Sequence, residues 1–192
     1  MGFILRLSGA LLLSAILGLG SAWYEVRYST ATGAGIENGP WQTNLTAGGS
    51  SADIYTRARV ALFGLLALNK SETIYYTARR DSAGQAFDPK CNYRIEGRDP
   101  EARWWSFTAY GADNYLIANA QNRYSVSKNN VVRASGGAFS IRLSTTPEAQ
   151  NWIATSPDGF DVTLRLYNPG LGVLADPASV TLPAIVKEAC TS

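Results

Sequence analysis

The sequence of 192 residues contains no histidine. Histidine is the commonest general base and the commonest zinc ligand, and Ser-His and Cys-His nucleophiles require it. Its absence excludes these catalytic arrangements, so any acid–base chemistry has to use carboxylates, Tyr, Lys or Arg. The chain also has no glycine-rich phosphate loop of Walker or Rossmann spacing and no EF-hand pattern. We therefore expect neither a metal site nor a cofactor.

Cysteine is almost as scarce, because Cys91 and Cys190 are the only two. They lie far apart in the chain, which excludes a CxxC metal or redox site. Two arrangements remain open. The cysteines form a disulfide if the domain lies outside the cytoplasm, or they are two free and partly buried thiols.

An excess of charge of one sign is missing as well. The 17 Lys and Arg against 15 Asp and Glu give a formal net charge of +2. Charges of both signs are scattered along the chain, and there is neither a basic patch nor an acidic tail. We therefore expect no nucleic-acid partner.

One uncharged apolar run, residues 7–24, stands at the start of the chain. It is long enough to cross a bilayer as a helix, with Arg6 on the cytoplasmic side and Trp23 and Tyr24 at the far interface. This reading predicts a single-pass inner-membrane protein with a periplasmic domain. The alternative is a signal peptide cleaved near Ala22, which would secrete the protein to the periplasm. Both readings export the rest of the chain.

Residues 25–40 are rich in turn-forming residues and are expected to be a linker, and residues 41–192 are expected to form one domain. A helix is predicted over residues 51–68, with Ser50 or Ser51 as its cap and Asp53 in its first turn. We expect it to pack on the sheet and to be buried in its second half. Its apolar stripe consists of Ile54, Ala58, Ala61, Leu62, Leu65 and Leu66.

The remaining sequence alternates with period two, which is typical of strands. The most aromatic stretch, residues 103–110, places Trp105 and Phe107 on one face, and we expect it at the centre of a sheet. Short strands separated by turns predict a mainly β, antiparallel sandwich. The predicted strands are residues 73–80, 91–96 as the return strand of a hairpin, 103–110, 123–127, 139–143, 160–167 and 180–186.

An ordered set of short motifs between Trp41 and Val186 resembles the bacterial family called domain of unknown function 1214. The motifs are Tyr55-Thr56-Arg57-Ala58-Arg59, Glu72 with Tyr75-Tyr76, Trp104-Trp105-Ser106 with Tyr110, Asn122-Arg123-Tyr124-Ser125, Asn151-Trp152, and Leu164-Arg165-Leu166-Tyr167 before Pro169. The resemblance implies a jelly-roll-like β-sandwich. In longer relatives a second domain, domain of unknown function 1254, precedes this one, so a protein that carries it is a candidate partner. The family has no established activity and implies no site residues.

The most promising polar cluster is Asn122, Arg123 and Tyr124, in which an Arg fork for a carboxylate or phosphate lies beside an aromatic wall. The alternative is architectural: the Arg satisfies loop carbonyls while the Tyr packs. Exposed aromatic residues could form a platform for sugars or for a protein, or be covered on both sides of the sheet. These aromatic residues are Tyr75, Trp104, Tyr110, Tyr115 and Trp152.

Two functions follow from these features. The first is an exported cell-envelope module for binding or assembly, with a protein partner or a glycan. The second is a histidine-free hydrolase in which paired carboxylates act on a carbohydrate or small ester. Two close carboxylates in a cleft would favour the hydrolase, and a flat apolar patch would favour the binding module. The candidate acids are Glu72, Asp81, Asp88, Glu96, Asp99, Glu101 and Asp113.

Overall fold

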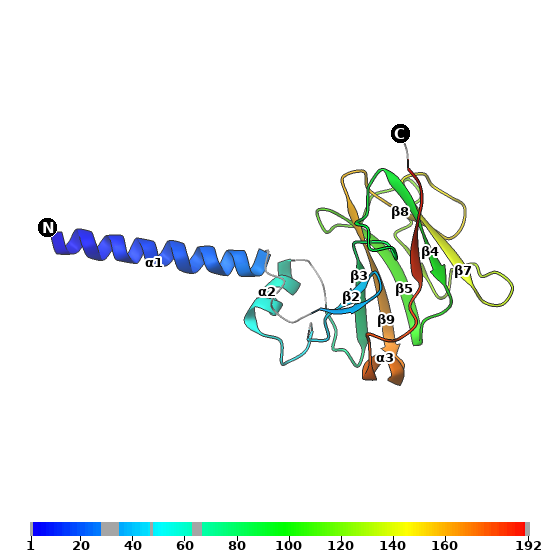
Figure 1. Cartoon of the computed structure of the whole chain (residues 1–192), viewed down its shortest axis with the longest axis horizontal. Helices are drawn as coiled ribbons and strands as arrows, with labels where there is room; N and C mark the ends of the chain where they lie inside the picture. The colour runs from blue at the N-terminus through cyan, green and yellow to red at the C-terminus, as the bar shows by residue number, and fades with distance from the viewer. Residues whose placement is uncertain (1, 28–34, 47, 63–66, 191–192) are drawn as a thin grey trace.

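A computed structural model describes residues 2–27, 35–46, 48–62 and 67–190. The first element is the helix α1 (Gly2–Arg27), whose apolar side chains are exposed along its length. Figure 1 shows that α1 extends away from the β-rich part of the molecule. Its length and composition suit a membrane span, and a signal sequence near the N-terminus has the same properties.

The larger of two sheets has six strands in the order β1-β2-β3-β9-β5-β6, and each strand is antiparallel to its neighbours. The aromatic strand β5 lies between the long β9 and the short edge strand β6. The bounds are β1 (Ile36–Asn38), β2 (Trp41–Thr43), β3 (Thr73–Ala78), β5 (Ala102–Gly111), β6 (Ser125–Ser127) and β9 (Phe160–Pro169).

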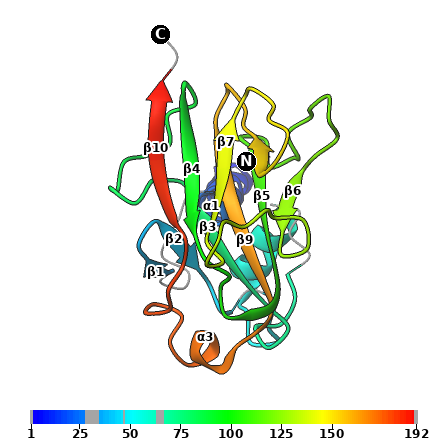
Figure 2. The same ribbon diagram turned by 90° about the vertical axis from the view of Figure 1, so that its right-hand side faces the viewer.

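The smaller sheet has four strands in the order β10-β4-β7-β8. Its pairs are antiparallel except β7 with β8, which run parallel and so depart from the antiparallel prediction. Its members are β4 (Cys91–Gly97), β7 (Phe139–Ser144), β8 (Trp152–Ala154) and β10 (Ala184–Cys190). Figure 2 shows this sheet in front of the six-stranded one, with α1 behind both.

The core lies between the two sheets and consists mainly of the alternate strand residues whose side chains point inward. On β5, Trp105 and Phe107 are fully buried, as the aromatic pattern predicts. Trp105 contacts Phe139 of β7 with ring centroids 5.1 Å apart, so the rings join one sheet to the other. The indole Nε1 of Trp41 on β2 also donates to the carbonyl of Pro183, which precedes β10, at 2.8 Å. The protein is thus mainly β, in two packed layers.

Two predicted connections are wrong. Residues 73–80 and 91–96 do not form a hairpin: β3 pairs with β2 and β9 in one sheet, whereas β4 pairs with β10 and β7 in the other. The turn after Arg80 keeps only an isolated bridge between Arg80 and Ala86. The chain therefore crosses from one sheet to the other between β3 and β4, because the apolar faces of these two strands point into one shared core. In addition, β1 lies within the range expected to be a linker.

The predicted long helix is shorter and placed differently. The described helix α2 (Ile54–Leu62) begins after Asp53, whose Oδ1 accepts hydrogen bonds from the N–H groups of Tyr55 and Thr56. Asp53 is therefore the cap, in place of Ser50 or Ser51. Residues 63–66, which include Leu65 and Leu66, lie outside the described residues.

The expectation that this helix is buried on the sheet is wrong for its described part. Leu62 is exposed, and α2 packs against the carboxyl end of α1. The two sheets already cover each other's apolar faces, so no inner face remains for a helix to cover. A short helix, α3 (Leu171–Ala175), follows β9 and has no counterpart in the predictions.

Candidate functional site

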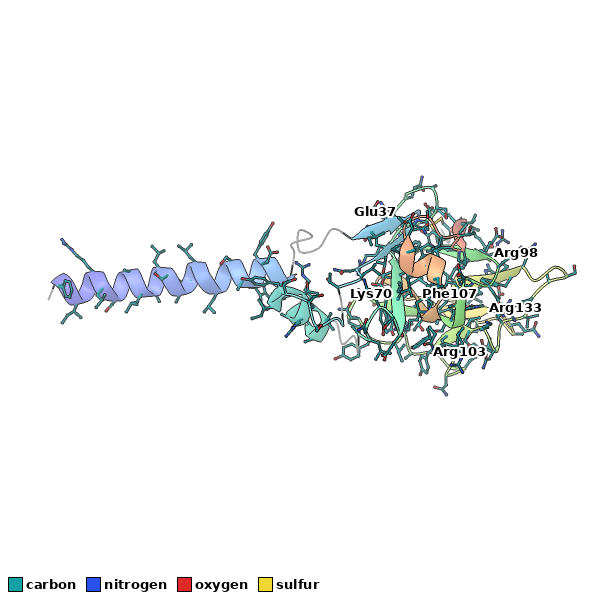
Figure 3. All side chains as sticks on the ribbon, turned by 90° about the horizontal axis from the view of Figure 1, so that it is seen from below. Glu37, Lys70, Arg98, Arg103, Phe107 and Arg133 are labelled. Carbon is teal, nitrogen blue, oxygen red and sulfur yellow. A yellow bond between two sulfur atoms is a disulfide. The ribbon has the colours of Figure 1, made fainter. Side chains whose placement is uncertain are left out.

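A groove of about 810 Å³ lies where β10, β4 and β7 meet the loop of residues 132–138. Its volume falls in the range of small-molecule and peptide pockets. Figure 3 places the labelled Arg98 and Arg133 on the side of the molecule that faces away from α1. The lining residues are Glu96, Gly97, Arg98, Val132, Arg133, Ala134, Ala138, Phe139, Ser140, Asn151 and Ala184.

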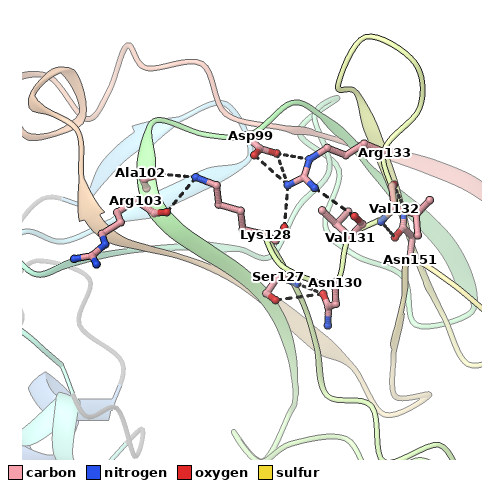
Figure 4. Close-up of polar contacts among 10 residues, drawn as sticks. All are labelled: Asp99, Ala102, Arg103, Ser127, Lys128, Asn130, Val131, Val132, Arg133 and Asn151. Atoms are coloured by element: carbon pink, nitrogen blue, oxygen red, sulfur yellow. Dashed lines mark hydrogen bonds and ion pairs between the residues drawn. The ribbon is translucent and has the colours of Figure 1, made fainter.

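One wall of the groove is fixed by Arg133. Its Nε and Nη2 donate to the two carboxylate oxygens of Asp99 at 2.9 and 3.0 Å, and Nη2 also donates to the carbonyl of Lys128 at 3.0 Å (Figure 4). A bidentate pair of this kind fixes the guanidinium plane and neutralises its charge. Arg133 is therefore part of the scaffold of the groove.

The loop of residues 132–138 is held by Asn151, which precedes β8. Its side-chain oxygen accepts a hydrogen bond from the N–H of Val132 at 2.8 Å, and its Nδ2 donates to the carbonyls of Val132 and Ser140 at 2.7 and 3.0 Å. Asn151 adopts a left-handed backbone conformation with φ 44°, which asparagine tolerates better than most residues. These contacts make the groove a preformed feature.

Arg98 differs from Arg133 in having no acid partner. It is exposed, and its Nη1 donates to the carbonyl of Gly136. Among the described residues, no carboxylate forms an ion pair with it. The groove therefore offers a guanidinium with free donors beside the apolar side chains of Val132, Ala138 and Ala184, a combination that suits a ligand with a carboxylate and an apolar part.

The only acid in the lining, Glu96, is already paired. Its Oε1 forms an ion pair with Nε of Arg94 at 2.6 Å, and Arg94 also pairs with Glu188 at 3.3 Å. Glu188 in turn pairs with Arg142 at 3.1 Å, which makes a ladder of charges across the outer face of the four-stranded sheet. This half-exposed pair ties the end of β4 into the ladder, so Glu96 stabilises the strand ends.

A second, smaller pocket of about 320 Å³ contains Asp161. Burial raises the pKa of the Asp161 carboxyl above its ordinary value of 3.8, while the guanidinium of Arg79, 3.3 Å away, opposes the rise. Asp161 is the only acid in the lining of this pocket. Neither pocket lining brings two carboxylates together, and the described residues contain no cluster of three or more potential metal ligands.

Most of the candidate acids have structural partners. Asp81, Asp88 and Asp113 accept hydrogen bonds from backbone N–H groups of residues that follow closely in the chain, which is typical of turn residues. Asp99 and Glu96 pair with arginines, as described above. Among the described residues, neither pocket lining supplies the pair of carboxylates that the hydrolase hypothesis requires.

The cluster of Asn122, Arg123 and Tyr124 is architectural in this structure. Arg123 donates to the backbone carbonyls of Glu148 and Ala149 at 3.2 and 3.0 Å, so its fork is used to join two loops. Tyr124 donates to the side chain of Asn122 at 3.4 Å. The three residues lie together, as their sequence positions require, and they line neither described pocket.

Tyr75 and Trp104 both lie on the outer face of the six-stranded sheet. The guanidinium of Arg165 lies 6.0 Å from the ring centroid of Tyr75 and 5.4 Å from that of Tyr110, and it donates to the Tyr110 hydroxyl. Trp104 packs edge-on against Tyr167 with centroids 5.2 Å apart. Tyr75, Trp104 and Tyr110 are each half-buried, and Arg165 and Tyr167 take up part of their ring surface.

The other two aromatic candidates, Tyr115 and Trp152, differ in exposure. Tyr115 is exposed, whereas Trp152 is fully buried, and its Nε1 donates to the carbonyl of Ser144 at 3.1 Å. The expectation that Trp152 contributes to an exposed surface is therefore wrong, because its side chain is completely enclosed by the protein.

Cys91 and Cys190 are register partners on β4 and β10, and the structure joins them in a disulfide. The bond ties the last strand to the sheet across a sequence separation of 99 residues. It leaves no free cysteine among the described residues.

The profile of a family described as "Protein of unknown function (DUF1214)" matches residues 72–171, just over half of the chain. The chain belongs to the DUF1214 family. The match includes the groove except for Ala184, and it includes β3 to β9. The resemblance inferred from the ordered motifs is thereby confirmed.

One solved structure shows a similar fold, and a second match is weaker. The VPA0106 protein from Vibrio parahaemolyticus is 23% identical with a TM-score of 0.57, and the match covers 72% of this DUF1214 chain and 36% of that protein. A putative uncharacterised protein from Burkholderia cenocepacia is 23% identical with a TM-score of 0.42, covering 63% of this chain and 31% of that one. The chain thus spans about a third of the length of these proteins. No curated protein matches it.

Sequence reasoning misses the groove of this DUF1214 protein. Its polar residues come from β4, from the loop of residues 132–138 and from Asn151, and no spacing rule connects them. The pair Gly136-Gly137 indicates a turn, and Asn151 stands out only as part of the family motif set. Gly136 and Gly137 adopt positive φ values of 87° and 80°, which glycine permits, and the turn that they form lies next to Arg98.

Proposed function

We propose that the protein is an exported, inner-membrane-anchored binding module of the cell envelope. Residues 7–24 of α1 form the anchor in this proposal, with Arg6 in the cytoplasm and the sandwich in the periplasm. Support comes from the length and exposure of α1 and from the disulfide, which is stable in an oxidising compartment.

The groove is the proposed binding site, and the observation that carries this proposal is the unpaired Arg98 beside an apolar floor. An arginine without an acid partner at the edge of a preformed groove favours a ligand that brings a carboxylate. The lining contains neither Trp nor Tyr, so the stacking surface that sugars favour is missing. This composition favours a segment of a partner protein over a glycan.

A protein that carries domain of unknown function 1254 is the partner we propose to test first. The match covers only about a third of the Vibrio parahaemolyticus protein, so that protein contains further chain next to its similar part. The groove faces away from α1 and is therefore open to the periplasm in an anchored molecule (Figure 3). We also propose that the two sheets form a jelly-roll-like sandwich, as the family resemblance implies.

Site-specific photo-crosslinking in cells of the source bacterium tests this function. Val132 in the groove and Leu116 outside it are each 48% exposed, so they are matched positions for a photoreactive amino acid. We expect a single protein partner cross-linked at position 132 and absent at position 116. The substitution Arg98→Glu should reduce that cross-link about tenfold or more, since it replaces an attractive charge by a repulsive one. Equal cross-linking at both positions, or none at position 132, would overturn the proposed site.

A further inference from the structure

The described part of α2 exposes the apolar side chains of Ile54 and Leu62, with the partly buried Ala58 between them. Ile54, Ala58 and Leu62 are spaced by four residues and so share one helix face. Ile54 is 76% exposed and Leu62 is 55% exposed, whereas Thr56 on the opposite face is 5% exposed. A soluble helix has the reverse arrangement, with its apolar stripe toward the core. The outward stripe therefore needs an apolar surface other than the sandwich.

Contacts with α1 fix the position of α2 along the membrane normal. The guanidinium of Arg59 donates to the carbonyls of Glu25 and Val26 at 2.6 and 3.2 Å, and it lies 3.9 Å from the Glu25 carboxylate. These acceptors belong to the last turn of α1, directly after the exposed pair Trp23 and Tyr24. Aromatic residues at the end of an apolar run mark the level of the lipid headgroups. In a spanning α1, α2 is therefore held at that level.

The charges of α2 suit this position. Arg57 and Arg59 lie on either side of the apolar face, at about 100° of helix rotation from its centre in each direction. Arg57 is exposed, and its Nη2 donates to the carbonyl of Ser50. An apolar stripe bordered by arginines is the pattern of a helix that lies in the membrane interface. Arg57 is the arginine of this pair that can reach the phosphates, because Arg59 is held by the last turn of α1.

We propose that α2 lies in the headgroup region of the membrane that α1 crosses, with Ile54, Ala58 and Leu62 directed toward the acyl chains. This inference rests on the proposed membrane anchor and adds a second attachment to it. Figure 1 shows α2 between the end of α1 and the six-stranded sheet. The two attachments together prevent the sandwich from rotating freely about α1 and direct its groove away from the bilayer.

Nitroxide labels on the full-length protein, reconstituted in vesicles of phosphatidylethanolamine and phosphatidylglycerol, test this inference. Because the two native cysteines are joined, an introduced cysteine is the reactive thiol among the described residues. The test position is Leu62→Cys. Leu13→Cys in α1 is the membrane control, and Leu171→Cys on α3, which is 84% exposed, is the aqueous control. Accessibility to oxygen, which concentrates in acyl chains, is compared with accessibility to an aqueous nickel complex at each position.

We expect the oxygen-to-nickel ratio at position 62 to be several-fold higher than at position 171 and to approach that at position 13. If position 13 has a membrane ratio while position 62 matches position 171, the anchor stands and the interfacial helix is wrong. If position 13 also has an aqueous ratio, both the anchor and the inference that depends on it are wrong. The double substitution Ile54→Asp and Ala58→Asp in the Leu62→Cys protein should lower the ratio at position 62 to that of position 171. An unchanged ratio would contradict insertion through the apolar face.

Discussion

Trp105 of β5 and Phe139 of β7 are in direct contact across the sandwich, with ring centroids 5.1 Å apart. Both side chains are buried, and Trp105 also packs against Phe107 of its own strand at 5.4 Å. The aromatic stretch predicted to be central in the sheet is therefore the place where the two layers meet. Removal of its largest ring should affect the cohesion of the whole domain.

We predict that Trp105→Ala lowers the free energy of unfolding by about 3–5 kcal/mol, because it leaves a large cavity between the sheets. Urea titration of the detergent-solubilised protein with its disulfide intact measures this loss. Trp104→Ala is the matched control, since Trp104 lies next in the chain but is half-buried on the outer face. A loss at position 104 equal to that at position 105 would show that the core is not where the structure places it.

The disulfide gives a second prediction. Replacing Cys91 and Cys190 by Ser should destabilise the protein by about 4 kcal/mol on the chain-entropy account, because the bond closes a very long loop. Alkylation after denaturation under non-reducing conditions should modify no thiol in protein from the periplasm or its membrane. Two alkylated cysteines in that fraction would contradict the disulfide and weaken the case for export.

Gly97 at the end of β4 gives a third prediction. A Cβ atom at this position would lie 2.8 Å from the Cβ of Pro183 and 3.0 Å from its Cα, closer than such atoms approach one another. Gly97→Ala should therefore destabilise the domain by about 1–3 kcal/mol, since the proline ring and backbone have little freedom to move. Gly35→Ala is the control, because its nearest neighbour would be an ordinary 3.8 Å away. Thermal unfolding of the two variants should separate them clearly, and equal midpoints would refute the close approach of β4 to the segment before β10.

The pH dependence of stability gives a fourth prediction. Burial raises the pKa of Asp161 in the folded protein above 3.8, the value expected for the unfolded chain. At a pH between the unfolded-state pKa and the folded-state pKa, the folded state therefore binds more protons than the unfolded state. Stability then falls as the pH rises through this window. Asp161→Asn removes the buried charge, and its advantage over the wild type should grow from near zero below pH 3.8 to a maximum at neutral pH.

Arg79→Gln serves as the control for this experiment. Loss of the opposing guanidinium should raise the pKa of Asp161 further and make the fall in stability with pH steeper. Urea titrations of the three proteins at several pH values measure the slopes. A difference between Asp161→Asn and wild type that stays constant with pH, or shrinks as the pH rises, would show that Asp161 is not desolvated.

The strands are the part of the fold that the sequence predicts well. Residues such as 160–167 alternate strictly between apolar and polar, and this pattern permits only a strand with one buried face. The short strands β1 and β2 are missed because glycine and asparagine surround them. The pairing of strands is harder to predict, because alternation shows which face is buried and not which strand lies alongside. For this reason the sequence cannot tell a hairpin of β3 and β4 from their separation into two sheets.

The helix and the groove mark two other limits of the sequence. The apolar stripe that includes Ile54 and Leu62 has the same spacing whether it faces a core or a membrane, so periodicity alone does not decide its position. The groove depends on tertiary contacts, above all on Asn151 holding Val132 across 19 residues of sequence. Arg123 illustrates the converse case, because a conspicuous motif uses its donors within the scaffold.

Protease treatment of intact cells, of cells with a permeabilised outer membrane and of inverted inner-membrane vesicles tests the anchored topology most directly. The account predicts that the sandwich is digested only when the outer membrane is opened, and that a fragment with the intact N-terminus and α1 stays in the membrane. Digestion of the sandwich in inverted vesicles would place it in the cytoplasm and contradict the account. A mature chain that begins after Ala22 and washes off the membrane would contradict the anchor in favour of secretion.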